Sequence, residues 1–208
     1  GGEVMFQKEH WQMLDHLIDI GKTDVMVMYV TNLTKLDYDG YRLLDYLPKF
    51  RNVTFTVSMD GTGDLLEYIR WGSKWDQIVK NLDTVNNLPN VHLRVNHVTM
   101  WYNVLALPET LDFLYGNGYL KEPHQLDLYI AHEPENHVGA LPTSLKAKAF
   151  QQIKSSKYYP LLQDKLDAVC NAMMSTKHTF PVKHFTDMDR RRGCDLLDIF
   201  PEFEPYLR

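Results

Sequence analysis

The feature of this sequence that most constrains its fold is a regular alternation between helical and extended segments. In the segment 8–20, apolar side chains recur at helical spacing and Gly21 follows where a helix cap belongs, so we predict a helix there. The next segment, 25–31, is a continuous apolar run, which predicts a parallel strand covered on both faces. Alternation of this kind indicates an α/β fold whose parallel strands are joined by right-handed crossovers.

The alternation continues along the chain and then stops. It predicts a short helix at 41–47, a strand at 53–59, a helix at 74–86, a strand at 91–99, a helix from 108 to about 116 and a strand at 126–131. Beyond Pro142 the strand pattern ends, and helical patterns follow at 145–153, 159–174 and 182–199. We therefore predict an α/β domain at 1–141 and a helical C-terminal region at 142–208.

Composition places the chain among globular proteins and excludes several classes of function. Its 208 residues are 44% hydrophobic and 24% charged, so it is long enough and apolar enough to bury a core. The net charge of −5 gives no broad basic surface, and we expect no nucleic-acid partner. No apolar stretch is long enough to span a bilayer, and we expect no membrane association. Cys170 and Cys194 form no C-x-x-C unit, which favours a reducing cytoplasm.

Polar side chains gather where the predicted strands end. Functional groups in parallel α/β folds collect at the carboxyl ends of strands, because the loops there vary without disturbing the core. The polar residues at these ends are Thr31, Asn32, Ser58, Asp60, Asn96, Thr99 and Asn103. The nearby segment Asp60–Gly63 lacks the third spaced glycine of a dinucleotide-binding loop. The strand ends are therefore the predicted ligand site, and a dinucleotide is not the predicted ligand.

Four motifs follow one another along the chain. They are Gly1-Gly2-Glu3, the strand end Thr31-Asn32, the strand end Ser58-Met59-Asp60-Gly61, and the segment Tyr68–Gly72 followed by Trp75–Ile78 and Asn81-Leu82. In this order they resemble the radical S-adenosylmethionine enzymes, over residue 1 to about residue 103. The segment 185–207 is similar to the ends of twitch-type members of that group. The chain departs from the family pattern at Val4, where Pro is common.

The resemblance implies a partial radical S-adenosylmethionine (β/α) barrel of parallel strands, followed by a helical C-terminal region. It also implies reductive cleavage of S-adenosylmethionine at a 4Fe-4S cluster to give a 5′-deoxyadenosyl radical. The cofactor-binding residues that it implies are, for the methionine ammonium, Gly1, Gly2 and Glu3; for the carboxylate, Ser58 and Arg70; for the ribose, Asp60 or Asn32; and beside the adenine, Val98, Thr99 and Asn103.

The cysteines that hold the family's cluster are missing from this chain. In the family they lie in a C-x-x-x-C-x-x-C loop upstream of the Gly-Gly-Glu motif, and Cys170 and Cys194 cannot replace three thiolates. We therefore expect no catalytic residue and no metal ligand here, and no cleavage of S-adenosylmethionine by this chain alone. The sequence begins at Gly1 without an initiator Met, so we expect a piece of a longer protein whose intact form carries the cluster.

A missing upstream part would leave the first predicted strand without a neighbour. Free backbone groups at such an edge can template another strand, so we expect self-association, or pairing with an upstream half or another protein subunit. We also expect the end of the chain at Glu3 to be poorly held.

Two other functions remain open at the level of sequence. His132, Glu133, Glu135 and His137 are the densest group of metal-ligand types, which allows a metal-dependent hydrolase that uses His132 and His137. Their spacing differs from H-E-x-x-H and Pro134 interrupts a helix, so a solvated loop is the favoured interpretation. The other alternative is a noncatalytic α/β module that binds a ligand or a partner. The sequence does not indicate the substrate.

Overall fold

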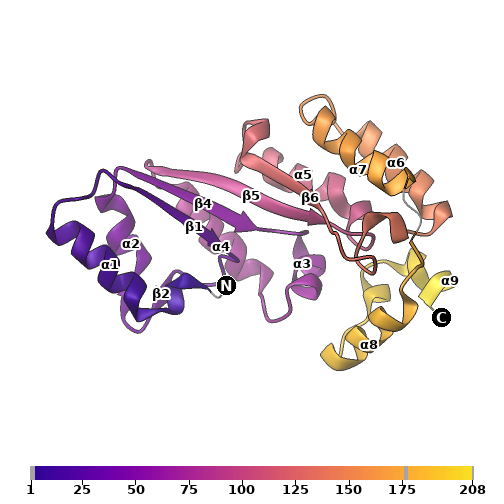
Figure 1. The fold of residues 1–208 in the computed structure, drawn as a ribbon, viewed down its shortest axis with the longest axis horizontal. Coiled ribbons are helices and arrows are strands. Elements are labelled where there is room, and N and C mark those ends of the chain that lie inside the picture. The colour runs from indigo at the N-terminus through magenta and orange to yellow at the C-terminus, as the bar shows by residue number, and fades with distance from the viewer. Residues whose placement is uncertain (1–2, 176–177, 208) are drawn as a thin grey trace.

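A computed structural model describes residues 3–175 and 178–207 of the chain. Its centre is a four-stranded sheet in which every neighbouring pair is parallel and the strands lie in the order in which they occur in the sequence (Figure 1). The strands of this sheet are β1 (Met26–Thr31), β4 (Asn52–Ser58), β5 (Val91–Thr99) and β6 (Leu126–Ile130). The predicted parallel α/β fold is thus confirmed.

The helices connect these strands and then continue alone after β6. They are α1 (Lys8–Asp19), α2 (Leu43–Tyr46), α3 (Gly63–Ile69), α4 (Trp75–Asn86), α5 (Leu107–Gly116), α6 (Thr143–Ser155), α7 (Gln163–Ser175), α8 (Val182–Arg192) and α9 (Glu204–Leu207). Short 3-10 turns lie at Val4–Phe6, Leu47–Lys49, Val104–Ala106, Pro123–Gln125, Val138–Ala140, Leu196–Asp198 and Pro201–Phe203. Helix α4 shows the rule that most of them follow: Ile78, Leu82 and Val85 share one face, and all three are buried.

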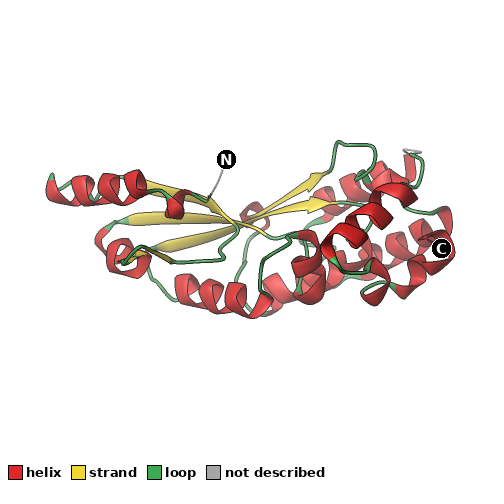
Figure 2. Ribbon diagram, turned by 90° about the horizontal axis from the view of Figure 1, so that it is seen from below, coloured by secondary structure: helices red, strands yellow, loops and turns green. Residues whose placement is uncertain are grey.

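The sheet is covered by helices on one face and largely open on the other. Figure 2 shows most of the helices below the strands of the twisted sheet. On the covered face, Tyr29 of β1 stacks on Phe55 of β4, with ring centroids 4.8 Å apart. On the other face of β1, Met26, Met28 and Val30 are 62%, 65% and 65% exposed. The prediction that the first strand is covered on both faces was therefore wrong, because an apolar run does not reveal whether a second layer is present.

Three local elements differ from the sequence prediction: a two-stranded hairpin, helix α3 and helix α8. Residues 41–42 do not begin a helix, since β3 (Tyr41–Arg42) pairs antiparallel with β2 (Asp37–Tyr38). The turn between these short strands places Asp39 and Gly40 at positive φ, the geometry of a tight two-residue hairpin turn. Helix α3 was not predicted at all. The last predicted helix is also shorter, because Gly193 takes the left-handed conformation and ends α8.

The C-terminal helices share one hydrophobic core with the sheet. Trp101, which follows β5, is fully buried and meets the rings of Phe185 and Phe203 with centroids 4.4 and 5.1 Å away. The described residues of 142–208 therefore pack on the end of the α/β unit rather than around a core of their own. Within the described part of the chain, no helix is long and apolar enough to cross a membrane.

Candidate functional site

The carboxylate that follows β4 forms a largely buried ion pair and also contacts β5. Asp60 follows β4, and its Oδ2 lies 2.7 Å from the Nη2 of Arg70, the residue after α3. Its other oxygen, Oδ1, accepts a hydrogen bond of 2.8 Å from the backbone N–H of Val98 in β5. The Asp60 side chain is 7% exposed and that of Arg70 is 20% exposed, so Arg70 is not a solvent-facing charge at a helix end. The pair fixes the loop after β4 against β5.

The same guanidinium extends the arrangement to β1 and to the start of the chain. Arg70 Nη1 donates to Asn32 Oδ1 at 2.5 Å. The Glu3 carboxylate accepts from Thr31 Oγ1 at 2.5 Å and from the Asn32 backbone N–H at 2.8 Å. The expectation that the chain is poorly held at Glu3 was therefore wrong, since both carboxylate oxygens bind the end of β1.

Asn103 completes the arrangement after β5. Its Nδ2 donates to the backbone carbonyls of Asp60 and Val98, at 2.9 Å each, and its Oδ1 accepts from the Met100 N–H at 2.7 Å. Asn103 is 1% exposed, so its amide replaces water for three backbone groups. We call the connected set the strand-end network: Glu3, Thr31, Asn32, Asp60, Arg70 and Asn103.

The structure places the other predicted site residues on two different faces. By strand alternation, Ser58 and Val98 point to the open face of the sheet near its carboxyl end, where both are partly exposed. Thr99 points the other way and is fully buried, so its side chain cannot border the same ligand as Val98. Gly1 and Gly2 lie outside the described residues.

Three buried polar atoms near this end of the sheet have no hydrogen-bond partner among the described residues: Arg70 Nε, His97 Nε2 and Thr99 Oγ1. The other ring nitrogen of His97, Nδ1, is 2.9 Å from the Met59 carbonyl oxygen, and burial lowers the pKa of this side chain. A neutral imidazole that donates from Nδ1 fits both observations. The unpaired Arg70 N–H is a donor that an anionic group beside the guanidinium would satisfy.

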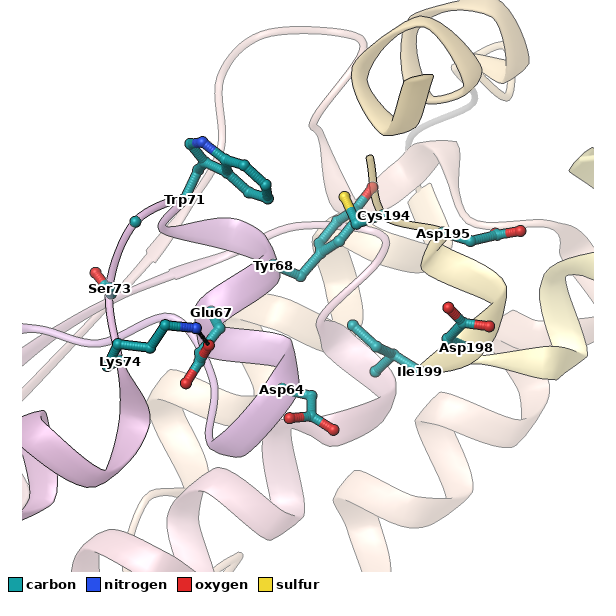
Figure 3. Close-up of a pocket in the computed structure, with 11 residues that line it drawn as sticks. Asp64, Glu67, Tyr68, Trp71, Ser73, Lys74, Cys194, Asp195, Asp198 and Ile199 are labelled. Atoms are coloured by element: carbon teal, nitrogen blue, oxygen red, sulfur yellow. Dashed lines mark hydrogen bonds and ion pairs between the residues drawn. The ribbon is translucent and has the colours of Figure 1, made fainter. Parts of the chain in front are cut away.

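An acidic pocket lies beside the network, between α3 and the segment after α8. The pocket has a volume of about 510 Å³. Figure 3 shows the side chains of Asp64, Glu67 and Asp198 that line it, with Trp71 at one side. Lys74 Nζ pairs with Glu67 at 2.7 Å, and this bond is the main cause of the lowered pKa of the Glu67 carboxyl. Trp71 is 61% exposed, so it does not serve the core.

The cysteines and histidines form no metal site in the part of the chain described. Residues 3–175 and 178–207 contain no group of three or more His, Cys, Asp or Glu side chains arranged to hold a metal ion. Cys170 is buried in α7 and Cys194 lines the acidic pocket, and burial raises the pKa of both thiols. His137 Nδ1 accepts the Gly139 N–H at 2.9 Å, which leaves one ring nitrogen for other partners. The hydrolase alternative gains no ligand set from this arrangement.

Sequence reasoning missed the residues that α8 brings to this end of the sheet. Arg192 Nη1 donates to the backbone carbonyl of Tyr68 at 2.9 Å, and Tyr68 Oη donates to Asp189 at 2.7 Å. These bonds join residues more than 120 positions apart in the chain. No local pattern indicates such a contact, although the run Arg190–Arg192 beside two aspartates marked α8 as charged.

Comparison with protein-family models, with curated proteins and with solved structures gave no match for this chain.

Proposed function

We propose that this chain forms the S-adenosylmethionine-binding part of a radical S-adenosylmethionine enzyme, at the carboxyl ends of β1, β4 and β5. The observation that carries the proposal is the strand-end network. Residues from four separate motifs, spread from Glu3 to Arg70, bind one another at one end of the sheet, and Asn103 after β5 joins them. The carboxyl ends of parallel strands are where such folds place their ligand sites, and the network lies there.

Helices cover mainly one face of the sheet, which supports a partial barrel rather than a doubly wound fold. Doubly wound sheets carry helices on both faces, whereas barrels carry them only outside and fill the inside with side chains. Here the open face presents Met26, Met28 and Val30 from β1 and Tyr129 from β6, the last 53% exposed. Exposed apolar side chains on this face suit the interior of an incomplete barrel.

The chemistry of the donor set fits S-adenosylmethionine. Its carboxylate requires donors. Ser58 and the second N–H groups of Arg70 Nη1 and Nη2, which bind neither Asn32 nor Asp60, supply them by charge-assisted hydrogen bonds. Its ammonium requires acceptors, and each Glu3 oxygen that already accepts one hydrogen bond retains a second lone pair. Asp60 is too buried to hold the ribose well, and we assign it the role of positioning Arg70.

A 4Fe-4S cluster does not fit the described residues, because Cys170 and Cys194 lie on different elements and no third ligand joins them. When bound and reduced at such a cluster, the cofactor supplies the radical chemistry in this family. The thiolates must then come from another segment or another subunit. The edge of β1 is where a strand of that segment or subunit can pair, since β1 pairs only with β4 among the described residues. Parallel strands extend a sheet through such edges.

The proposal is tested by measuring S-adenosylmethionine binding to the 208-residue chain by calorimetry. We expect saturable binding that weakens about tenfold in Ser58→Ala, since one hydrogen bond to a charged group is lost. Arg70→Gln should weaken it further. The matched control is Arg51→Gln, an exposed arginine at the opposite end of β4, which should bind as the unaltered chain does. A folded chain that fails to bind, or that binds equally well in all variants, would contradict the proposal.

A second experiment tests whether the cluster ligands come from another segment or subunit. After anaerobic incubation with iron, sulfide, dithionite and S-adenosylmethionine, we expect no 5′-deoxyadenosine from this chain alone. The product should form when the chain is joined to, or mixed with, a segment that carries the family's cysteine loop. Release of 5′-deoxyadenosine by the 208-residue chain alone would show that the cluster has ligands other than those assigned.

A further inference from the structure

A second pocket borders the strand-end network on the side of α8. It has a volume of about 500 Å³, within the range of small-molecule sites. Two of its lining residues, Ile69 and Tyr102, directly precede Arg70 and Asn103 in the chain, so the pocket begins where the network ends. We call it the basic pocket and define it by the lining residues that the argument uses: Tyr68, Tyr102, Asn136, His184, Arg191 and Arg192.

The charges around this pocket are mainly positive. Arg191 and Arg192 lie in the last turn of α8, and His184 lies in its first turn. Asp187, also in the lining, is paired with the neighbouring Arg190 at 2.7 Å. Within the described ranges, no ion pair joins Arg191 or Arg192 to a carboxylate. The two arginines of the pocket therefore have no ion-pair partner among the described residues, although the Asp187 carboxylate also lines it.

Arg192 is held in place and still has donors to spare. One of its five N–H groups binds the Tyr68 carbonyl at 2.9 Å, which sets the guanidinium against α3. The Tyr68 hydroxyl binds Asp189 from the same side, so α8 is attached to α3 by two contacts. A guanidinium that is fixed but unpaired suits bidentate recognition of a carboxylate or a phosphate.

The buried Tyr102 lines the basic pocket and directly precedes Asn103 of the network. Burial raises the pKa of its hydroxyl, Asp60 and Glu133 raise it further, and Arg192 lowers it. The hydroxyl is therefore within electrostatic reach of one residue from each region. A molecule seated in the basic pocket would lie next to the carboxyl end of the sheet.

The acidic pocket, which shares Tyr68 with the basic pocket, shows by contrast which of the two suits a negatively charged ligand. Tyr68 contributes to both pockets, but the acidic pocket is lined by Asp64, Asp198 and two further carboxylates (Figure 3). Clefts lined by one sign of charge concentrate ligands of the opposite sign. Of these two neighbouring pockets, only the basic pocket suits an anion.

We propose that the basic pocket binds the carboxylate or phosphate group of the substrate on which the proposed enzyme acts. That the ligand is the enzyme's substrate rests on the proposed function. That the pocket binds an anion does not. Arg191 and Arg192 provide the charge, while Asn136 and His184 provide further hydrogen-bonding groups.

The test uses inorganic phosphate and acetate as probes of the full chain, by amide NMR titration at constant ionic strength. We expect phosphate or acetate to shift the signals of residues around Tyr102, Asn136 and Arg191. Tighter binding of phosphate would identify a phosphorylated ligand, and equal or tighter binding of acetate a carboxylate. Arg191→Gln should weaken binding at least fivefold and should not unfold the chain, since Arg191 is exposed. The control Arg51→Gln should change nothing.

The two proposals fail in different ways. Saturable phosphate or acetate binding without S-adenosylmethionine binding would overturn the proposed function and leave an anion site. Binding of S-adenosylmethionine, unchanged in Arg191→Gln, together with no localised response to either anion would overturn the inference alone. Anion shifts that persist equally in Arg191→Gln would also overturn it.

Discussion

The strand-end network and the basic pocket lie side by side, and they differ in whether their charged side chains are paired. In the network, Arg70 is shared between Asp60 and Asn32, and little of the ion pair reaches solvent. In the basic pocket, Arg191 is exposed and no ion pair of the described residues includes it. Charges that bind each other when buried fix the backbone, and their removal costs stability. Removal of a charged side chain without a partner costs little stability. Such a side chain is available to bind a ligand.

The largest expected effect is in the network. Asp60→Asn keeps the shape of the side chain but leaves the partly buried Arg70 without a counter-charge. We expect a loss of about 2–3 kcal/mol in the free energy of unfolding, measured by chemical denaturation. The matched control is Asp24→Asn, because Asp24 is exposed and should cost less than about 0.5 kcal/mol. Equal effects of the two changes would remove the distinction between the two regions.

Asn103→Ala should have the next largest effect. It removes one side chain that serves three backbone groups, at Met100, Asp60 and Val98. We expect a loss of about 2 kcal/mol in the same measurement, because these buried groups have no water to replace the amide. Asn117→Ala is its control, since the exposed Asn117 amide makes a single hydrogen bond, to Phe113, and should cost only a few tenths of a kcal/mol.

The pH dependence of stability should report on His97. Its folded pKa is lowered by burial, so below its unfolded pKa of about 6.5 the unfolded state binds more protons than the folded state. The free energy of unfolding should therefore fall as the pH decreases from about 6.5 toward the folded pKa, by up to about 1.4 kcal/mol per pH unit. His97→Asn, which keeps a donor for Met59, should reduce this slope. His10 and His137, whose pKa values are also lowered by burial, will maintain part of it in both proteins. A slope unchanged in His97→Asn would show that this imidazole is protonated in the fold.

The smallest effect on stability is expected in the basic pocket. Arg191→Gln should change the free energy of unfolding by less than about 0.5 kcal/mol, since only its interaction with the C-terminal end of α8 is lost. A loss of more than about 1 kcal/mol would mean that Arg191 has a structural partner, and the contrast with Arg70 would disappear.

The sequence predicted the sheet better than the layers around it. Strand positions followed from apolar runs such as 53–59, because a run of this kind must be buried on at least one face. The open face of β1 was missed since Met26, Met28 and Val30 have the same apolar character as buried residues. The hairpin of β2 and β3 was missed although Asp39-Gly40 is a strong turn signal.

For the site, motif order brought together Glu3, Asn32, Asp60 and Arg70, and the position of Asn103 after a strand added this residue; the structure joins all five by hydrogen bonds. Motif order could not say which of them point at a ligand and which hold the others. That depends on burial, which differs between Ser58 on the open face and Thr99 on the covered face. The contribution of Arg192 depends on a contact across 124 residues and has no local signature.

The most direct test of the central claim is an amide NMR titration of the full chain with S-adenosylmethionine. The account predicts that the shifted signals cluster at Asn32, Ser58, Arg70 and Val98, with those of Asp64 and Asp198 in the acidic pocket unchanged. Shifts confined to the acidic pocket, or no shifts at saturating concentrations, would contradict the claim that the strand-end network holds S-adenosylmethionine.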